Sequence, residues 1–176
     1  MPVPPPTARL TFREMQPGDQ DAMHQLLGDP AVMWVYPHPY SRERVADWIE
    51  ANRRTYRDLG FGLWILSLRD TGEFVGECGL TPQALETGRE IELGYHVLPR
   101  FQGRGLATEA AIACRAFARD VARLDRIVSL IDPRNAASQR VAAKVGLVLE
   151  GEVRVPTKVL RVYATNFERV GSEAPS

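Results

Sequence analysis

The chain has 176 residues, and its 22 basic and 22 acidic residues give a formal net charge of zero. This length suggests one domain, which can bury roughly 70% of the surface of its unfolded chain without a disulfide or a metal. The composition, 44% hydrophobic and 25% charged, excludes a disordered chain, a collagen and a coiled coil, and the balanced charge argues against non-specific nucleic-acid binding.

The two ends of the chain differ in composition from the rest. Prolines at positions 2, 4, 5 and 6 predict a stiff, disordered segment over residues 1–7. The polar tail predicts a second flexible segment over residues 171–176. Residues 8–170 show no internal repeat and no linker, so we expect them to form a single domain.

Hydrophobic periodicity between these ends predicts both strands and helices. We expect helices at residues 19–27, 41–59, 106–123 and 135–146, with Ser41 and Asn135 as N-caps and with Leu59 and Val121 on buried faces. We expect strands at residues 8–13, 61–68, 74–80, 91–98, 126–131, 148–153 and 159–169. Consecutive strands followed by strand–helix alternation imply an α/β or α+β fold with a partly antiparallel sheet.

Cysteine content and hydropathy indicate the compartment. Cys78 and Cys114 are too few for a disulfide framework, and their apolar neighbours favour core packing. The first residues have neither the basic start nor the apolar core of a signal peptide. No apolar run reaches the ~18 residues of a membrane span. We therefore expect a cytoplasmic protein with reduced thiols and no membrane partner.

The segment from Glu92 to Ala110 carries the clearest chemical signal. It predicts a strand, a turn with Gly103 and Gly105, and the start of a helix. Glycine lets backbone N–H groups approach an anion, and a helix N-terminus adds partial positive charge, so the pattern favours a phosphate or diphosphate site. A dinucleotide fingerprint fails because position 108 is threonine, and a P-loop fails because Gly-Lys-Ser/Thr is missing. A plain strand-to-helix turn is the alternative.

Three motifs resemble one family. Gln102-Gly103-Arg104-Gly105-Leu106-Ala107 fits the Q/R-x-x-G-x-G/A loop of the GNAT acetyltransferases. Residues 135–146, NAASQRVAAKVG, resemble the N-x-x-S-x-R-V-x-x-K-x-G helix of the ribosomal-protein N-acetyltransferase (RimJ/RimL-like) subgroup. Residues 29–33, 39–41 and 48–49 resemble the N-terminal helices of that subgroup.

The resemblance implies a GNAT-like fold: a mixed, mostly antiparallel sheet of about seven strands, splayed between strands 4 and 5, with about four helices. It implies acetyl-CoA as cosubstrate and no metal. In that family the loop amides hold the diphosphate, strand 4 pairs with the pantetheine arm, and an N–H near Val97 polarises the thioester. The cofactor-binding residues carried over are Tyr95, His96, Val97, Gln102, Gly103, Arg104, Gly105, Leu106, Ala107, Thr108, Asn135 and Ser138.

The implied reaction is acetyl transfer from a thioester to an amine, which must lose a proton before it can attack. Glu92 matches the family's strand glutamate, and we predict it as the base or as a water-positioning residue; a solvated surface carboxylate is the alternative. By the same resemblance, Ser138 is expected near the thiol or the pantetheine and is the second catalytic candidate. His96 is chemically suited to be a base, but a packed or surface histidine is the simpler interpretation. Ala142 stands where many members carry a tyrosine as general acid, so the thiolate is expected to leave unaided.

The acceptor pocket is implied by the same resemblance. The family lines it with the segment between the first two helices, where this chain has Trp34, Tyr36, His38 and Tyr40. Aromatic side chains there can stack on a planar group or hold a cation, although a hydrophobic anchor for the loop explains them equally well.

We therefore expect an acetyl-CoA-dependent N-acetyltransferase that acts by direct transfer on a primary amine, either a small molecule or a protein N-terminus. The alternative is a catalytically degenerate CoA-binding sensor or interaction module of the same fold. We expect no nucleic-acid partner, and a homodimer is compatible with the family.

Overall fold

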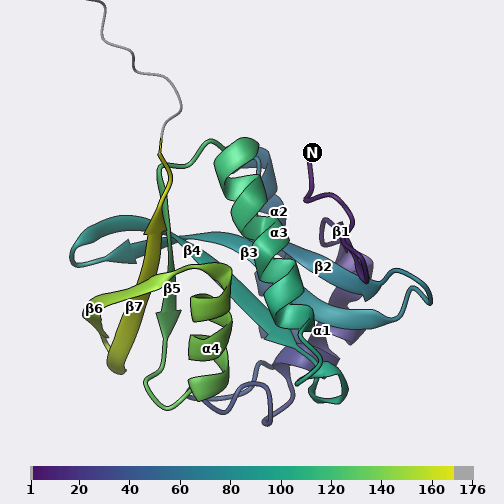
Figure 1. Ribbon diagram of the computed structural model, residues 1–176. Coiled ribbons are helices and arrows are strands. Elements are labelled where there is room, and N and C mark those ends of the chain that lie inside the picture. The colour runs from purple at the N-terminus through teal and green to yellow at the C-terminus, as the bar shows by residue number, and fades with distance from the viewer. Residues whose placement is uncertain (1, 169–176) are drawn as a thin grey trace, which may run out of the picture.

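The computed structural model describes residues 2–168, in which a seven-stranded sheet carries helices on both faces (Figure 1). The strands are β1 (Leu10–Arg13), β2 (Leu63–Leu68), β3 (Phe74–Leu85), β4 (Gly88–Val97), β5 (Arg126–Ile131), β6 (Val148–Val155) and β7 (Lys158–Asn166). They lie in the order β1-β2-β3-β4-β5-β7-β6, and all neighbours are antiparallel except β4 and β5. The predicted mixed, mostly antiparallel sheet is confirmed.

Four α-helices and two short 3-10 helices connect the strands of the described chain. They are η1 (Pro17–Asp19), α1 (Gln20–Leu27), α2 (Arg42–Leu59), η2 (Pro99–Phe101), α3 (Leu106–Asp120) and α4 (Ala136–Val145). α3 and α4 lie on one face of the sheet, and α1 and α2 lie on the other (Figure 1). Ser41 caps α2 as predicted, because its hydroxyl accepts a hydrogen bond from the amide of Arg44. No helix within residues 2–168 combines the length and hydropathy that would let it cross a membrane.

The core lies between the sheet and the helices on each face. Trp64 of β2 is fully buried and meets Phe117 of α3 edge-on, with 4.9 Å between ring centroids. Cys78 and Cys114 are buried free thiols, as their apolar neighbours predict. Leu59 and Val121 were expected on buried faces, but they are 48% and 49% exposed, because each stands at the C-terminal end of its helix where the chain leaves the core.

The β3–β4 hairpin is longer than the sequence predicts. The expected strands end at residue 80 and begin at residue 91, but pairing continues through Pro82↔Ile91 to Leu85↔Gly88. The additional residues include a proline and several charged side chains, which hide the usual strand pattern. The result is an arm of two strands that extends beyond the core.

The N-terminal segment and the end of β7 differ from the sequence-based expectations. Pro4 is buried and Val3 packs against the core, although residues 1–7 were predicted to be disordered. The Thr7 hydroxyl donates to Oε1 of Glu109 over 2.6 Å, which ties this segment to the first turn of α3. β7 ends at Asn166 rather than at residue 169, and the tail at 171–176 lies outside the described residues.

Candidate active site

β4 and β5 form a fork. Their parallel register is a single pair, Glu92 with Val128, and the Ser129 hydroxyl donates to the carbonyl oxygen of Leu93 over 2.7 Å. Beyond this point residues 94–97 pair with β3 on one side, and no strand of the described chain pairs with them on the other. That edge can therefore pair with an extended ligand, as an added strand would. The predicted splay between strands 4 and 5 is confirmed.

A cavity of about 640 Å³ lies in the fork and collects most of the predicted site residues. Those that line it are Trp34, Tyr36, Tyr40, Glu92, Tyr95, His96, Val97, Gln102, Gly103, Gly105, Leu106, Ala107, Thr108, Asn135 and Ser138. Arg104 and His38 do not line it. The guanidinium of Arg104 lies over the Phe101 ring, 5.5 Å from its centroid, and His38 is exposed on the loop.

The turn before α3 forms a cradle for an anion. Gly103 and Gly105 have φ angles of 72° and 76°, in the left-handed region that glycine adopts without strain. The Gln102 side chain donates to the carbonyl oxygen of Val97 over 2.9 Å and anchors the turn to β4. Gly105 is the N-cap of α3 and supplies no side-chain cap, so the N–H groups of residues 106–108 have no acceptor within the helix. These amides can donate to a diphosphate.

α4 forms the opposite wall of the cavity. Oδ1 of Asn135 accepts a hydrogen bond from the amide of Ser138 over 3.0 Å, which fixes the first turn of the helix. The Tyr95 hydroxyl donates to the carbonyl oxygen of Ser138 over 2.9 Å and so bridges the fork from β4 to α4. Ala142 is buried in this helix, and none of the residues of α4 is a tyrosine.

Glu92 lies where β4 and β5 part. Its Oε2 accepts from the Gln83 side chain over 2.6 Å, and its Oε1 accepts from the amide of Leu130 over 3.3 Å. Burial raises the pKa of Glu92 to about 7, although both hydrogen bonds and the nearby His96 favour the carboxylate. A carboxyl group with this pKa can take up and return a proton near neutral pH. Glu92 thus lines the cavity and is not the solvated surface carboxylate of the alternative prediction.

Sequence reasoning missed the residue behind His96. Glu77 of β3 is fully buried, and its Oε1 lies 2.8 Å from Nδ1 of His96. Trp48 donates from Nε1 to Oε2 of the same carboxylate over 3.0 Å, and the Tyr36 hydroxyl lies 3.0 Å from Nε2 of His96. A charged residue inside the apolar strand at 74–80 was the available signal, because a buried carboxylate requires partners.

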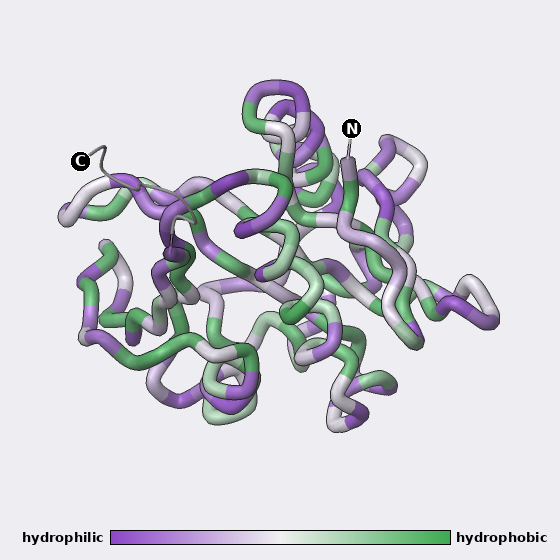
Figure 2. The backbone as a smooth tube through the Cα atoms, turned by 45° about the horizontal axis from the view of Figure 1, so that its top comes forward, coloured by the Kyte–Doolittle hydropathy of each residue, from purple (hydrophilic) through white to green (hydrophobic). Residues whose placement is uncertain are grey.

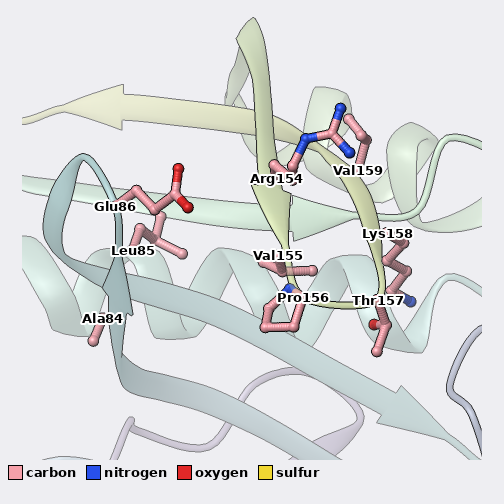
Figure 3. Close-up of a pocket in the computed structure, with 9 residues that line it drawn as sticks. All are labelled: Ala84, Leu85, Glu86, Arg154, Val155, Pro156, Thr157, Lys158 and Val159. Carbon is pink, nitrogen blue, oxygen red and sulfur yellow. The ribbon is translucent and has the colours of Figure 1, made fainter.

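Two hairpins lie beside the cavity and enclose a second hollow between them. The tip of the β3–β4 hairpin, with Glu86, faces the β6–β7 turn across a hollow of about 540 Å³ (Figure 3). Lys158 lines both this hollow and the fork, so the two spaces adjoin. Its ammonium donates to the carbonyl oxygen of Val35 and lies 5.3 Å from the centroid of the Tyr36 ring. β7 thereby holds the segment between α1 and α2 over the cavity.

Comparison with known proteins identifies the family. A model of the acetyltransferase (GNAT) domain matches residues 9–148. The chain belongs to the GNAT acetyltransferase family. Its relatives include the uncharacterized protein YkkB of Bacillus subtilis strain 168, which is 37% identical over 158 residues, 89% of this chain and 92% of YkkB.

Solved structures of other acetyltransferases share the GNAT fold. The acetyltransferase of Agrobacterium tumefaciens strain C58 superposes with a TM-score of 0.83 and is 28% identical, covering 95% of this chain and 96% of that one. RimL, a ribosomal L7/L12 alpha-N-protein acetyltransferase in complex with coenzyme A, superposes with a TM-score of 0.74 at 21% identity, covering 94% and 98%.

The family recognised from the loop and from α4 is therefore confirmed, and with it the enzyme class and the cosubstrate: a GNAT N-acetyltransferase that uses acetyl-CoA. The cavity fits this cosubstrate. A Cβ added to Gly103 meets no atom within 4 Å, so the space beside the cradle is open, and the unpaired edge of β4 continues from it.

Arg9 supports the turn before α3 through hydrogen bonds to the turn and to the first turn of the helix. Its Nη1 donates to the carbonyl oxygen of Arg104 over 2.8 Å, and its Nε donates to Oε2 of Glu109 over 2.7 Å. We expect Arg9→Ala to lower the affinity for acetyl-CoA about 3- to 10-fold, because the loop amides lose their brace, while stability changes by less than about 1 kcal/mol. Isothermal titration with acetyl-CoA measures the first quantity, and thermal unfolding measures the second.

Arg13→Ala is the matched control for this prediction. The Arg13 side chain is 49% exposed, like that of Arg9, and it pairs with Asp19 away from the cavity. Its loss should leave the affinity for acetyl-CoA unchanged. Equal affinities of Arg9→Ala and Arg13→Ala would show that the brace has no part in binding.

Proposed function

We propose that acetyl-CoA binds along the fork, with its diphosphate at residues 103–108 and its arm beside residues 95–97, and that a primary amine enters from the hairpin side. The single observation that carries this proposal is the shared cavity. Its wall includes, at one part, the N-terminus of α3, which has no side-chain cap, and at another the carboxyl group of Glu92. Both parts of an acetyl transfer, donor binding and proton removal, have candidate groups in this one space.

Acetyl-CoA supplies the thioester, and the chain supplies the surroundings in which an amine can attack it. An N–H group near Val97 is the candidate to polarise the thioester carbonyl. Glu92 is the candidate to take a proton from the ammonium group, because its pKa of about 7 leaves a large fraction ionised at neutral pH. Ser138 on α4 and Asn135, the N-cap of that helix, line the same space from the opposite wall. A thiolate, with an ordinary pKa of about 8.5, leaves without a dedicated acid.

The acceptor proposed is a small primary amine rather than a protein N-terminus. The contact of Lys158 with Val35 closes the segment between α1 and α2 down onto β7, which narrows the acceptor side. The adjoining hollow carries the cationic Arg154 and Lys158 opposite Glu86, so it does not offer the acidic surface that a basic ribosomal protein would need. The cytoplasmic location, the homodimer and the absence of nucleic-acid and membrane partners stay predictions from the sequence.

Ligand-induced stabilisation tests this proposal first. Acetyl-CoA at about 100 times its dissociation constant should stabilise the native state by about 2.7 kcal/mol, and a nicotinamide dinucleotide at the same concentration should not. Release of free thiol is then measured with a panel of small primary amines and a panel of short peptides. Turnover with the small amines is the expected result. A shift with acetyl-CoA but no turnover on either panel would favour the CoA-binding module over the enzyme, and absence of any shift would contradict both.

A further inference from the structure

Four side chains from two helix-side and two strand segments, namely α2, the loop before it, β3 and β4, form a hydrogen-bonded series that reaches the cavity. Trp48 of α2 donates to Glu77 of β3, Glu77 meets His96 of β4, and His96 meets Tyr36 from the loop before α2. The Tyr40 ring packs edge-on against Trp48, with 5.9 Å between centroids. Glu77 does not line the cavity, whereas Trp48, His96 and Tyr36 do. The series thus runs from a buried carboxylate to the open space where the amine is proposed to enter.

The partners set the direction of each hydrogen bond. The indole Nε1 of Trp48 can only donate, and a carboxylate can only accept, so Oε2 of Glu77 accepts from Trp48. Oε1 of Glu77 then requires a second donor, which is Nδ1–H of His96. With its proton on Nδ1, the neutral imidazole has a lone pair on Nε2, where it accepts from the Tyr36 hydroxyl. This arrangement is that of a base poised behind a tyrosine hydroxyl.

Amide formation needs two proton transfers away from one nitrogen. An ammonium group loses one proton to become a nucleophile, and the same nitrogen loses a second as the C–N bond forms. Glu92 can accept one of them. The second proton also has to leave the nitrogen, and a side chain that reaches the attacking amine can accept it as the C–N bond forms.

We propose that the Tyr36–His96 pair accepts the second proton, with Glu77 as the positioning residue behind it. This inference rests on the proposed function. The N–H bond of the attacking amine breaks as an O–H bond forms at Tyr36, and the former Tyr36 proton moves to Nε2 of His96. The amide, a thiolate, a neutral Glu92 carboxyl group and an imidazolium result, so charge is conserved. Return of both protons to the thiolate and to solvent resets the site.

The surroundings of the pair suit this role. Desolvation of the Tyr36 hydroxyl, helped by the carboxylates of Glu92 and Glu77, raises the pKa of Tyr36 well above its ordinary value. Tyr36 therefore stays neutral and passes a proton on instead of holding a negative charge. The charged groups that face the pair are Glu77 from β3, Glu92 from β4 and Lys158 from β7. Glu77 contacts Nδ1 of His96, and Lys158 lies 5.3 Å from the centroid of the Tyr36 ring.

A pair of substitutions distinguishes this role from a merely structural one. In Glu77→Gln the new amide oxygen is needed by Trp48, so the amide NH₂ group is turned toward Nδ1 of His96. The imidazole proton must then move to Nε2, and the lone pair that faces Tyr36 is lost. Adding Trp48→Phe removes the competing donor, which lets the amide oxygen at position 77 accept from Nδ1–H again. The single variant should thus lose the base, and the double variant should recover it.

The experiment combines imidazole ¹⁵N spectra with kinetics on an amine that the wild-type enzyme acetylates. The chain has three histidines, and His96→Gln assigns the signal of His96. We expect the wild type at pH 8 to carry its proton on Nδ1, Glu77→Gln to carry it on Nε2, and the double variant to return it to Nδ1. In parallel, kcat should fall about 100-fold in His96→Gln and in Tyr36→Phe and about 10-fold in Glu77→Gln, with recovery in the double variant. The KM for acetyl-CoA should not change.

The pH profile separates the two proton acceptors. The activity limb near pH 7 should persist in Tyr36→Phe and disappear in Glu92→Gln. If the wild type acetylates the amine and both Tyr36→Phe and His96→Gln keep the wild-type kcat, the inference is overturned and the proposed function stays intact. A proton on Nε2 in the wild type would also overturn it, by a readout that needs no turnover. No acetylation of any amine or peptide by the wild type would refute the proposed function and this inference with it.

Discussion

Replacing Glu92 by glutamine should lower kcat about 10²- to 10⁴-fold, the range associated with loss of a general base. The substitution keeps the size of the side chain and leaves an oxygen that can still accept from Leu130. It removes the carboxylate that we propose as the proton acceptor. The shift of the unfolding temperature with acetyl-CoA should be retained, because the cradle at residues 103–108 is not touched. Steady-state thiol release and thermal unfolding measure the two effects.

The pH dependence gives this prediction a sign. Burial raises the pKa of Glu92 from its ordinary 4.5 to about 7, so the ionised base is depleted below pH 7. The wild-type kcat should rise with pH to a plateau above about 7, and Glu92→Gln should lack this limb.

The contribution of Glu92 to the unfolding free energy changes with pH in the opposite direction. Between pH 4.5 and 7 the folded state binds more protons than the unfolded one, so this group's contribution to stability falls as pH rises. The difference in unfolding free energy between Glu92→Gln and the wild type should therefore favour the variant more at pH 8 than at pH 5.

Glu90→Gln is the control for Glu92→Gln. Glu90 precedes Glu92 by two residues on β4 and pairs with Arg126 over 3.2 Å, outside the cavity. Its loss should leave kcat and the pH limb unchanged. Equal activity of Glu92→Gln and Glu90→Gln would show that the proton leaves by another route.

Substituting Gly103 by alanine should raise the dissociation constant of acetyl-CoA about 10- to 100-fold. Gly103 has a φ of +72°, and a side chain there disfavours the backbone that aims the loop amides at an anion. Loss of one hydrogen bond to a charged group costs about 1.5–3 kcal/mol, which corresponds to this range. Titration calorimetry with acetyl-CoA measures the effect. Gly105 is less suitable for this test, because a Cβ added there would contact the Arg9 guanidinium at 3.5 Å and change a second interaction.

Gly72→Ala controls for backbone strain. Gly72 has a φ of +74°, and an added Cβ meets no atom within 4 Å, as at Gly103. It stands in the hydrophilic turn between β2 and β3, which projects from the body of the molecule (Figure 2). Both substitutions should cost about 1–2 kcal/mol of stability through strain in the left-handed region. Only Gly103→Ala should lose affinity. Equal affinities in the two variants would mean that the turn before α3 does not hold the diphosphate.

Local patterns were enough for much of the fold. β5 matches its expected range of 126–131, and the N-caps Ser41 and Asn135 begin their helices as predicted. These features depend on contacts between residues a few positions apart, so periodicity and capping residues reveal them. The expected ends of β3 and β4 were less accurate, because pairing across the hairpin extends strands whose own composition is weak.

The amino-acid sequence by itself determined the family, the cosubstrate and the loop before α3, since these are carried by contiguous motifs at 102–107 and 135–146. Only the tertiary structure decided which distant side chains meet at the candidate site. Glu77 contacts His96, 19 residues later in the sequence, because the β3–β4 register places them opposite each other. Lys158 contacts Val35, which lies 123 residues earlier in the sequence. The raised pKa of Glu92 likewise comes from burial at the fork. Such contacts depend on register and packing between distant segments, which no local pattern encodes.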